Sequence, residues 1–388
     1  MAWEGVHQFE CPTRVFFGMG AAALVGDSLA ELGVTHALVV SDSGIQAAGI
    51  VDQVADRIRS REIAVSIYAD TQPNPTTTNV AEAAALWAEN DCDGLVGLGG
   101  GSSMDCAKGA GIVVANGGPV AEYTGKDNVP NDLPPLVCLP TTCGTGSEVT
   151  FNAVITDPEA HVKLVYVTRK LAPDVALVDP ELVLPAPAHV IAATGADALA
   201  HAIESYLNTG ADPLLDAINI AAIRKIGENL RAAVLERDRR AVAEMALAST
   251  MAGIAFNMNA NAIVHAASTP VTARHDVPHG IANGIFMPAG LAFLAPACGP
   301  QMRRIAEALG QDVSRLSESE AAGRAVAAVR ELLADVGIPP TLREFGVDPG
   351  DVDIPTLVED AMKSRNIVTN PRPVGPSDLA ELYRVVLG

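Results

Sequence analysis

Residues 93–108 read DGLVGLGGGSSMDCAK. The apolar first half predicts a buried β strand at 93–100, and a helix is expected to follow. A strand that is apolar along its whole length is typical of a parallel sheet covered on both faces. Glycines at the end of such a strand let a ligand approach the backbone, and the N–H groups of the next helix attract phosphate. We therefore interpret this loop as a phosphate-binding site made by Gly99, Gly100, Gly101, Ser102 and Ser103.

The same pattern extends over the first half of the chain. Short apolar runs alternate with amphipathic stretches, which predicts a parallel sheet with helices on both of its faces. Strands are expected at 36–42, 63–70, 93–100 and 133–141. Helices are expected at 47–61, 78–90 and 103–115, and a hairpin followed by a last strand between 153 and 179.

After Pro185 the pattern changes to long, alanine-rich stretches with helical periodicity. Helices are expected at 188–208, 212–234, 238–257, 260–273, 280–297, 299–309, 318–337, 354–364 and 376–387. Prolines interrupt both patterns between 180 and 187. We predict an α/β domain with a Rossmann-like, dinucleotide-binding parallel sheet at 1–183, and an all-α domain at 184–388.

A second loop after a predicted strand is rich in hydroxyl groups. It reads PTTCGTGSE at 140–148, and Thr141, Thr142, Thr145 and Ser147 are candidates to bind a cofactor amide or ribose. Part of this loop is also explained as a capping box from Thr145 to Glu148. Likewise, many strand–helix turns use glycine for geometry alone, and the first loop is not a GxGxxG motif.

Asp42 stands at the end of the predicted strand at 36–42. An acid at this place in a dinucleotide fold accepts hydrogen bonds from the ribose diol and repels a 2′-phosphate. An Asx turn explains the same residue equally well.

Two stretches of the second half combine an acid with histidines. Asp197 and His201 are spaced i, i+4 and so share one helix face, and His265 and His279 follow in a stretch that a proline interrupts. One carboxylate and three imidazoles suit a divalent metal such as Fe²⁺ or Zn²⁺. Two structural alternatives stay open: Asp197 closes a capping box begun by Thr194, and His265 is a hydrogen-bonded core histidine.

Composition excludes several classes of function. The 388 residues are 49 % hydrophobic and 19 % charged, so a sizeable core is expected rather than disorder. A net charge of −20 argues against binding to nucleic acid or to anionic membranes. We expect no membrane span and no secretory signal, and the scattered cysteines favour a reduced, cytoplasmic protein.

Taken in order, these motifs resemble the iron-dependent (group III) alcohol dehydrogenase family over essentially the whole chain. The matching segments are PNPT at 73–76, GGGSSMDCAK at 99–108, PTTCGTGSE at 140–148, Lys163, LVDP at 177–180, TGADALAHAIESY at 194–206, and VHAASTP with VPHGIAN between 264 and 283. The resemblance implies that NAD(P) binds in the cleft between two domains with its pyrophosphate on the glycine loop. It adds Asn74, Asp105 and Lys163 to the cofactor site and favours NAD because position 42 is Asp.

The resemblance also implies that Asp197, His201, His265 and His279 hold Fe²⁺ or sometimes Zn²⁺, and that the protein is a homodimer or a larger assembly. The chain departs from the family at Thr269, where a histidine often faces the substrate. Threonine can relay a hydrogen bond but cannot carry a proton as imidazolium does. His275 is a candidate substitute, with a surface position as its alternative. We therefore keep both Thr269 and His275 as candidates for a proton relay.

The expected function is hydride transfer between a small alcohol or aldehyde and NAD(H), assisted by the metal. Candidates to line the substrate pocket are Phe256, Asn257, Asn259 and Asn261, although the asparagines explain helix caps as well. A metal-independent reductase similar to maleylacetate reductase is a rival, as is an enzyme similar to glycerol dehydrogenase or dehydroquinate synthase. A nucleotide-binding protein without catalysis is the rival from another class.

Overall fold

The structure is a computed structural model and describes residues 6–160, 162–210 and 212–388. The chain forms two compact units. One comprises Cys11–Ala186, and the other comprises Pro187–Gly388 together with the described residues that precede Cys11. The sequence suggests a boundary between residues 183 and 184, whereas the two units divide between Ala186 and Pro187.

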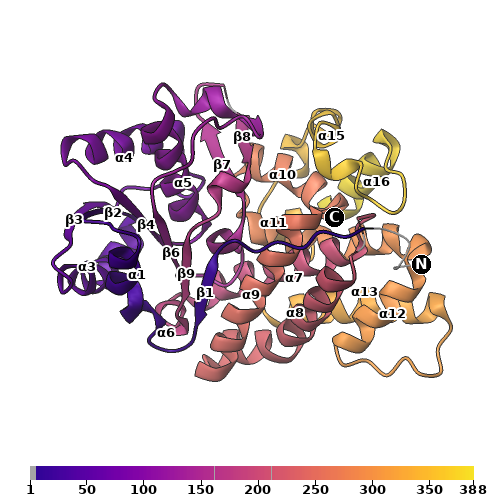
Figure 1. The fold of residues 1–388 in the computed structure, drawn as a ribbon. Coiled ribbons are helices and arrows are strands. Elements are labelled where there is room, and N and C mark those ends of the chain that lie inside the picture. Colours follow the sequence, from indigo (N-terminus) through magenta and orange to yellow (C-terminus); the bar gives the residue numbers. More distant parts are fainter. Residues whose placement is uncertain (1–5, 161, 211) are drawn as a thin grey trace. The chain divides into compact units, whose positions relative to one another are not determined.

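The first unit is built on a six-stranded parallel sheet with the order β1-β9-β6-β4-β2-β3 (Figure 1). Its strands are β1 (Arg14–Phe17), β2 (His36–Val40), β3 (Ala64–Tyr68), β4 (Gly94–Gly99), β6 (Leu136–Pro140) and β9 (Val175–Val178). The predicted α/β parallel sheet is thereby confirmed. Strand β1 was not predicted, because this edge strand of four residues is only partly buried and therefore lacks a continuous apolar signal.

Helices cover both faces of this sheet (Figure 1). They are α1 (Val25–Glu31), α2 (Ser43–Ala47), α3 (Ile50–Arg59), α4 (Thr77–Glu89), α5 (Gly101–Asn116) and α6 (Pro180–Val183). Leu38 and Leu95 pack toward one core, with residues of α4 and α5. Their strand neighbours Val39 and Val96 pack toward the other core, with residues of α1 and α3. Burial on both faces explains why these strands are apolar without alternation.

A second, three-stranded sheet has the order β5-β8-β7. It contains β5 (Gly125–Lys126), β7 (Asn152–Asp157) and β8 (Val162–Val167). Strands β7 and β8 are antiparallel, with Val154 opposite Val165, so the predicted hairpin is confirmed. The last predicted strand, β9, joins the main sheet between β1 and β6.

The second unit is helical in its described residues. Its helices are α7 (Ala188–Leu207), α8 (Pro213–Arg231), α9 (Arg239–Asn259), α10 (Ile263–His275), α11 (His279–Leu294), α12 (Gly299–Ala308), α13 (Glu318–Asp335), α14 (Leu342–Phe345), α15 (Ile354–Met362) and α16 (Pro376–Leu387). A π-helical turn, Ala232–Glu236, extends α8. Most predicted helices agree within three residues at each end, and α14 was missed because a single turn carries no periodicity.

Two apolar helical segments meet the length and composition of a membrane span, Arg239–Asn259 and His279–Ala297. No such segment was expected from the sequence. Within the structure, 61 % of the apolar window of the first and 56 % of the second are buried. Burial of this kind is what a core helix in a helical unit requires.

Asp93 joins the beginnings of two central strands, and its loss should weaken the sheet. Its carboxylate accepts hydrogen bonds from the backbone N–H groups of Thr35 and His36 and from the Thr35 hydroxyl. Burial raises the pKa of Asp93, but these hydrogen bonds outweigh it and hold the pKa below its usual value. Asp93→Asn should therefore lower the free energy of unfolding at neutral pH by about 1 kcal/mol, allowing for solvent screening.

The stabilisation from a carboxylate of lowered pKa is present above its unfolded pKa and is lost as the pH falls through its folded pKa. Urea unfolding of wild type and Asp93→Asn should therefore converge in acid. Asp91→Asn, at an exposed neighbouring position, is the control. A difference between wild type and Asp93→Asn that is equally large at acid and neutral pH would contradict this assignment.

Candidate metal and cofactor site

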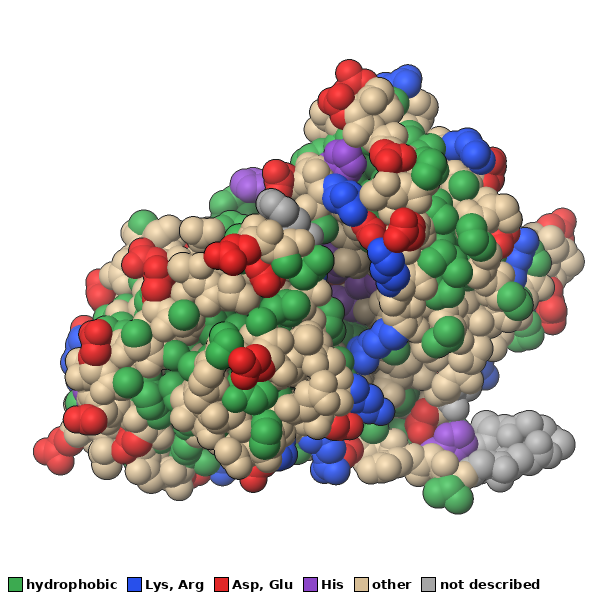
Figure 2. Space-filling view, turned by 90° about the horizontal axis from the view of Figure 1, so that it is seen from above, with side chains coloured by type: hydrophobic (Ala, Val, Ile, Leu, Met, Phe, Trp, Pro, Cys, Tyr) green, Lys and Arg blue, Asp and Glu red, His purple; other side chains and the backbone are tan. Residues whose placement is uncertain are grey.

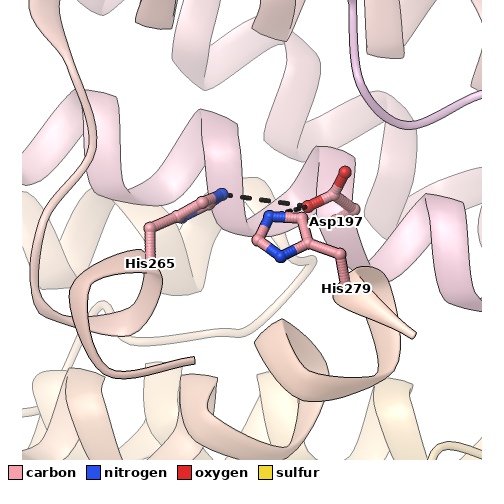
Figure 3. A group of neighbouring side chains, drawn as sticks. All are labelled: Asp197, His265 and His279. Atoms are coloured by element: carbon pink, nitrogen blue, oxygen red, sulfur yellow. Dashed lines mark ion pairs between the residues drawn. The ribbon is translucent and has the colours of Figure 1, made fainter. Parts of the chain in front are cut away.

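Three predicted ligands come together in the helical unit (Figure 3). Asp197 lies on α7, His265 on α10 and His279 at the start of α11. The Nε2 atoms of both histidines lie 3.8 Å from Asp197 Oδ1, and the three ligand atoms are all within 4.8 Å of one another. Asp197 and His265 are buried, whereas the His279 side chain is 36 % exposed. Oxygen and nitrogen donors at this spacing fit a divalent cation with one side open to a small molecule.

The local sequence explains how two histidines fourteen residues apart converge. Helix α10 ends at His275, and Asp276 adopts a left-handed backbone conformation with a φ of 51°. Pro278 then precedes α11, so that His279 is the first residue of the returning helix. Gly280 permits a close approach to α7, because a Cβ atom there would lie only 2.0 Å from the carbonyl oxygen of Ala193. The turn and the close approach bring His279 beside Asp197.

His201, the fourth predicted ligand, lies next to this group without joining it. Its Nδ1 atom is 3.9 Å from Asp197 Oδ2, the other carboxylate oxygen. Its ring stacks on Phe256 at 4.2 Å and on His265 at 4.6 Å between ring centroids. The structure thus gathers three of the four predicted ligands, and the role of His201 as the fourth stays a prediction.

The capping alternative for Asp197 is wrong. Helix α7 begins at Ala188, so Thr194 lies inside the helix and its hydroxyl donates to the carbonyl oxygen of Val190. Burial raises the pKa of the Asp197 carboxyl, but the three nearby histidines and a hydrogen bond from Asn283 hold it below its usual value. The side chain is therefore a buried carboxylate rather than a helix cap.

Glu204 orients His265 and was missed by the sequence analysis. It is fully buried, and its carboxylate accepts hydrogen bonds from the backbone N–H groups of Val264 (2.6 Å) and His265 (3.2 Å). It also lies 2.5 Å from Nδ1 of His265. A carboxylate acceptor there keeps the proton on Nδ1 and leaves the lone pair of Nε2 toward Asp197. The alternative that His265 is a hydrogen-bonded core histidine therefore stays open, because Nε2 also lies 3.1 Å from the amide nitrogen of Asn283.

Asn283 is the second residue that was missed at this centre. It is fully buried on α11, four residues after His279. Its Nδ2 atom donates to Asp197 Oδ1 at 2.7 Å and lies 3.1 Å from Nε2 of both His265 and His279. Helical spacing could have identified both residues, because Asn283 is one turn from His279 and Glu204 is two turns from Asp197.

The glycine loop joins β4 to α5 as predicted. Gly99 has a φ of 147°, and a Cβ atom there would lie 2.4 Å from the hydroxyl of Ser103, so only glycine fits. Gly100 precedes α5, and no side chain caps this helix. The first N–H groups of α5 are therefore suited to bind an anion such as a phosphate.

Asp42 lies against this loop and also caps a helix. One carboxylate oxygen, Oδ1, accepts hydrogen bonds from the backbone N–H groups of Gly44 and Ile45 at the start of α2. The other, Oδ2, accepts the Ser103 hydroxyl at 3.1 Å. The turn alternative is therefore correct for Oδ1, and Ser103, which is fully buried, fixes the direction of the carboxylate.

A buried lysine, which was not singled out from the sequence, supports the hydroxyl-rich loop at 140–148 from its buried side. Lys108 on α5 donates to the carbonyl oxygens of Ser147, Thr150 and Asn152 at 2.7–3.0 Å. Asp105 accepts the Ser147 hydroxyl and the backbone N–H of Val154. Burial lowers the pKa of Lys108 and raises the pKa of Asp105. Asp105 and Ser147 therefore organise the loop from its buried side.

The predicted capping box between Thr145 and Glu148 is wrong. A short 3₁₀ turn, Ser147–Val149, follows Gly146 without a side-chain cap. Instead, the Thr145 hydroxyl accepts the N–H of Ser147 at 3.3 Å. Thr141 is buried and donates its N–H to Gly99, which joins the two loops. Thr142, which is half-buried, lies over Gly100.

Asn74 and Lys163 are hydrogen-bonded to each other beside the glycine loop. The Lys163 ammonium donates to Asn74 Oδ1 at 2.9 Å, and the N–H of Asn74 donates to the Ser102 hydroxyl at 3.3 Å. Burial lowers the pKa of Lys163. The two predicted cofactor residues therefore lie next to a third, Ser102.

Thr269 and His275 lie on α10 beyond His265. The Thr269 hydroxyl donates to the backbone carbonyl of His265 at 2.7 Å, so its proton is engaged within the helix. His275 is half-buried at the end of the helix. Asn259, predicted for the substrate pocket, donates to the carbonyl of Ser205 and joins the end of α9 to α7. Phe256 meets the metal-site group by stacking on His201.

Comparison with known proteins identifies the family. The model named iron-containing alcohol dehydrogenase matches residues 12–180, and the C-terminal model of the Fe-containing alcohol dehydrogenase family matches residues 191–387. The chain is 40 % identical over 377 residues to 1,3-propanediol dehydrogenase of Klebsiella pneumoniae, covering 96 % of this chain and 97 % of that one. It is 40 % identical over 380 residues to NAD-dependent methanol dehydrogenase of Bacillus methanolicus, covering 98 % and 99 %.

Comparison of the fold with solved structures identifies the same family. A crystal structure of 1,3-propanediol oxidoreductase superposes with a TM-score of 0.96 at 38 % identity, covering 99 % of this chain and 100 % of that one. The chain therefore belongs to the iron-containing alcohol dehydrogenase family, and the predicted hydride transfer between alcohol and aldehyde, with NAD and iron as cofactors, is confirmed at that level.

Proposed function

We propose that this protein interconverts a short primary alcohol or diol and its aldehyde at a metal held by Asp197, His201, His265 and His279. The observation that carries the proposal is the gathering of three of these ligand atoms within 4.8 Å. The partial exposure of His279 beside two buried ligands supports a small substrate that reaches the metal from one side. The similarity to enzymes named for 1,3-propanediol and methanol supports the same size class.

We propose that NAD binds the α/β unit, with different residues contacting its pyrophosphate and its two riboses. The backbone of Gly99, Gly100 and Gly101, with Ser102, holds the pyrophosphate at the start of α5. Thr142, Thr145, Lys163 and Asn74 contact the nicotinamide ribose side, and Asp42 accepts from the adenosine ribose. Ser103, Asp105 and Ser147 support the loops from their buried side, because their hydroxyl or carboxyl groups are hydrogen-bonded inside the unit. Thr141 is buried and joins the two loops through its backbone N–H.

The chain's own residues prepare the reaction in three ways. Glu204 keeps the His265 lone pair available, as its 2.5 Å contact to Nδ1 supports. Phe256 stacks on His201 and keeps water from that side of the ligand group. His275 takes up the alcohol proton. The Thr269 hydroxyl donates to the carbonyl oxygen of His265, so it takes part only as a hydrogen-bond acceptor. A divalent cation held by the ligand group supplies Lewis acidity toward the substrate oxygen, and NAD supplies the hydride acceptor.

We also propose small-molecule partners, a cytoplasmic location and an assembly of two or more copies of the chain. The net charge of −20, with acidic side chains spread over the visible surface (Figure 2), supports small-molecule partners rather than nucleic acid. A cytoplasmic location and a homodimer or larger assembly stay predictions from the cysteine pattern and the family resemblance.

Chelation should separate turnover from cofactor binding. Treatment with a strong chelator should abolish oxidation of 1,3-propanediol and other short alcohols, and Fe²⁺ or Zn²⁺ should restore it. NADH binding, measured by its fluorescence, should survive because the proposed cofactor residues all lie in the α/β unit. Full turnover by protein that contains no metal would contradict the proposal and favour a metal-independent reductase. A panel of alcohols and aldehydes without turnover in either metal form would also contradict it.

Removing the charge of Asp42 should relax the preference for NAD. Asp42→Asn keeps an oxygen that can cap α2 but no longer repels a 2′-phosphate. A charge pair several ångströms apart is worth about 1–4 kcal/mol in partly screened surroundings, so the ratio of kcat/KM for NADP to that for NAD should rise by about tenfold or more. Asp52→Asn, an exposed acid on α3, is the matched control. An unchanged ratio would remove Asp42 from the cofactor site.

The proton relay can be tested by separating its two candidates. His275→Ala should lower kcat/KM for alcohol oxidation by about 10²-fold, because the proposed proton acceptor is gone. Added imidazole should restore part of the rate. Thr269→Val should lower the rate without changing the shape of the pH profile, since a hydroxyl does not titrate in this range. An unchanged kcat/KM in both variants would place the relay elsewhere.

A further inference from the structure

The amide nitrogen of Asn283 lies closer to each of the three gathered ligand atoms than either histidine nitrogen lies to Asp197 Oδ1. Its Nδ2 atom is 2.7 Å from Asp197 Oδ1 and 3.1 Å from each Nε2 of His265 and His279. Those nitrogens are themselves 3.8 Å from Asp197 Oδ1. One amide group therefore contacts every member of the group drawn in Figure 3.

The orientation of this amide is set by a second buried residue. The Ser268 hydroxyl, on α10 one turn after His265, donates to Oδ1 of Asn283. Both Ser268 and Asn283 are fully buried. With its oxygen engaged by Ser268, the amide presents its N–H groups to the ligand atoms. A donor is the partner that a buried carboxylate requires.

We propose that Asn283, oriented by Ser268, is a positioning residue that organises the metal centre. It holds the Asp197 carboxylate at the distance where both imidazoles can share a cation with it. This inference rests on the proposed ligand set, because it has meaning only if Asp197, His265 and His279 bind the metal.

The chemistry of the two acceptor types explains how one amide can serve this role. A carboxylate oxygen has more than one lone pair, so Asp197 Oδ1 can accept the amide N–H and bind a cation together. Each Nε2 has a single lone pair, for which amide and cation compete. The amide therefore keeps its hydrogen bond to the carboxylate when the metal binds, and it gives up its contacts to the two imidazole nitrogens. Loss of such an outer partner typically weakens metal affinity by about 10–100-fold.

The experiment measures metal affinity rather than turnover. Full-length protein is stripped of metal and titrated with Zn²⁺ in competition with a chromophoric chelator. Asn283→Leu has nearly the same shape without hydrogen bonds and should raise the Kd by about 10–100-fold. Ser268→Ala leaves the amide without its orienting partner and should raise the Kd to a smaller extent. It also keeps the test decisive if the leucine variant does not fold.

Asn219→Leu is the matched control. Asn219 is an equally buried asparagine of the same unit, and its amide donates to the hydroxyl of Ser205 rather than to a proposed ligand. Its substitution should lower the thermal unfolding temperature of the metal-free protein, as Asn283→Leu does, but leave the Kd for Zn²⁺ unchanged. A merely structural Asn283 would make the two variants alike in both measurements.

The outcomes distinguish a failure of the role proposed for Asn283 from a failure of the proposed ligand set. If Asp197→Ala loses Zn²⁺ binding while Asn283→Leu and Ser268→Ala bind as tightly as wild type, or more tightly, the role of Asn283 is overturned and the ligand set stands. If wild type and Asp197→Ala bind Zn²⁺ equally, or neither binds it, the ligand set itself fails and the role of Asn283 fails with it.

Discussion

The ligand group of the helical unit is built around a buried negative charge, the carboxylate of Asp197. Asp197 is 3 % exposed, and a carboxylate removed from water to this extent requires donors or a cation close to it. Three imidazoles and the amide of Asn283 surround it, and together they lower its pKa against the opposing effect of burial. Each of the helices α7, α10 and α11 supplies part of this environment. The charge therefore couples the packing of three helices to the binding of a metal.

In the α/β unit a buried positive charge plays the corresponding part. Its buried cation, Lys108, is fully enclosed and satisfied by backbone carbonyl oxygens of the loop that follows β6. Asp105, one turn earlier on the same helix, holds that loop through Ser147 and Val154. The hydroxyl-rich loop proposed to bind the dinucleotide is therefore supported by the charged groups of Lys108 and Asp105, which lie on its buried side. A loop stiffened in this way binds a ligand with less loss of conformational freedom.

The sequence predicted most of this architecture because the strongest signals are local. Continuous apolar strands and alanine-rich periodic helices identified both halves, and the order of the motifs identified the family. Side chains that act through a neighbour were missed, since Glu204, Asn283 and Lys108 have roles only once α5, α7, α10 and α11 are packed. Both mistaken capping boxes had the right residue types but the wrong helix start. Four ligands were expected and three came together, whereas the fourth, His201, lies beside the other carboxylate oxygen of Asp197.

The most direct measurement is the position of the metal itself. Crystals grown with Fe²⁺ under anaerobic conditions would be measured at the iron absorption edge, where anomalous scattering locates iron without reference to the protein. We expect one strong peak within bonding distance of Asp197 Oδ1 and of Nε2 of His265 and His279. A fully occupied iron elsewhere in the protein, with these three side chains directed away from it, would contradict the account.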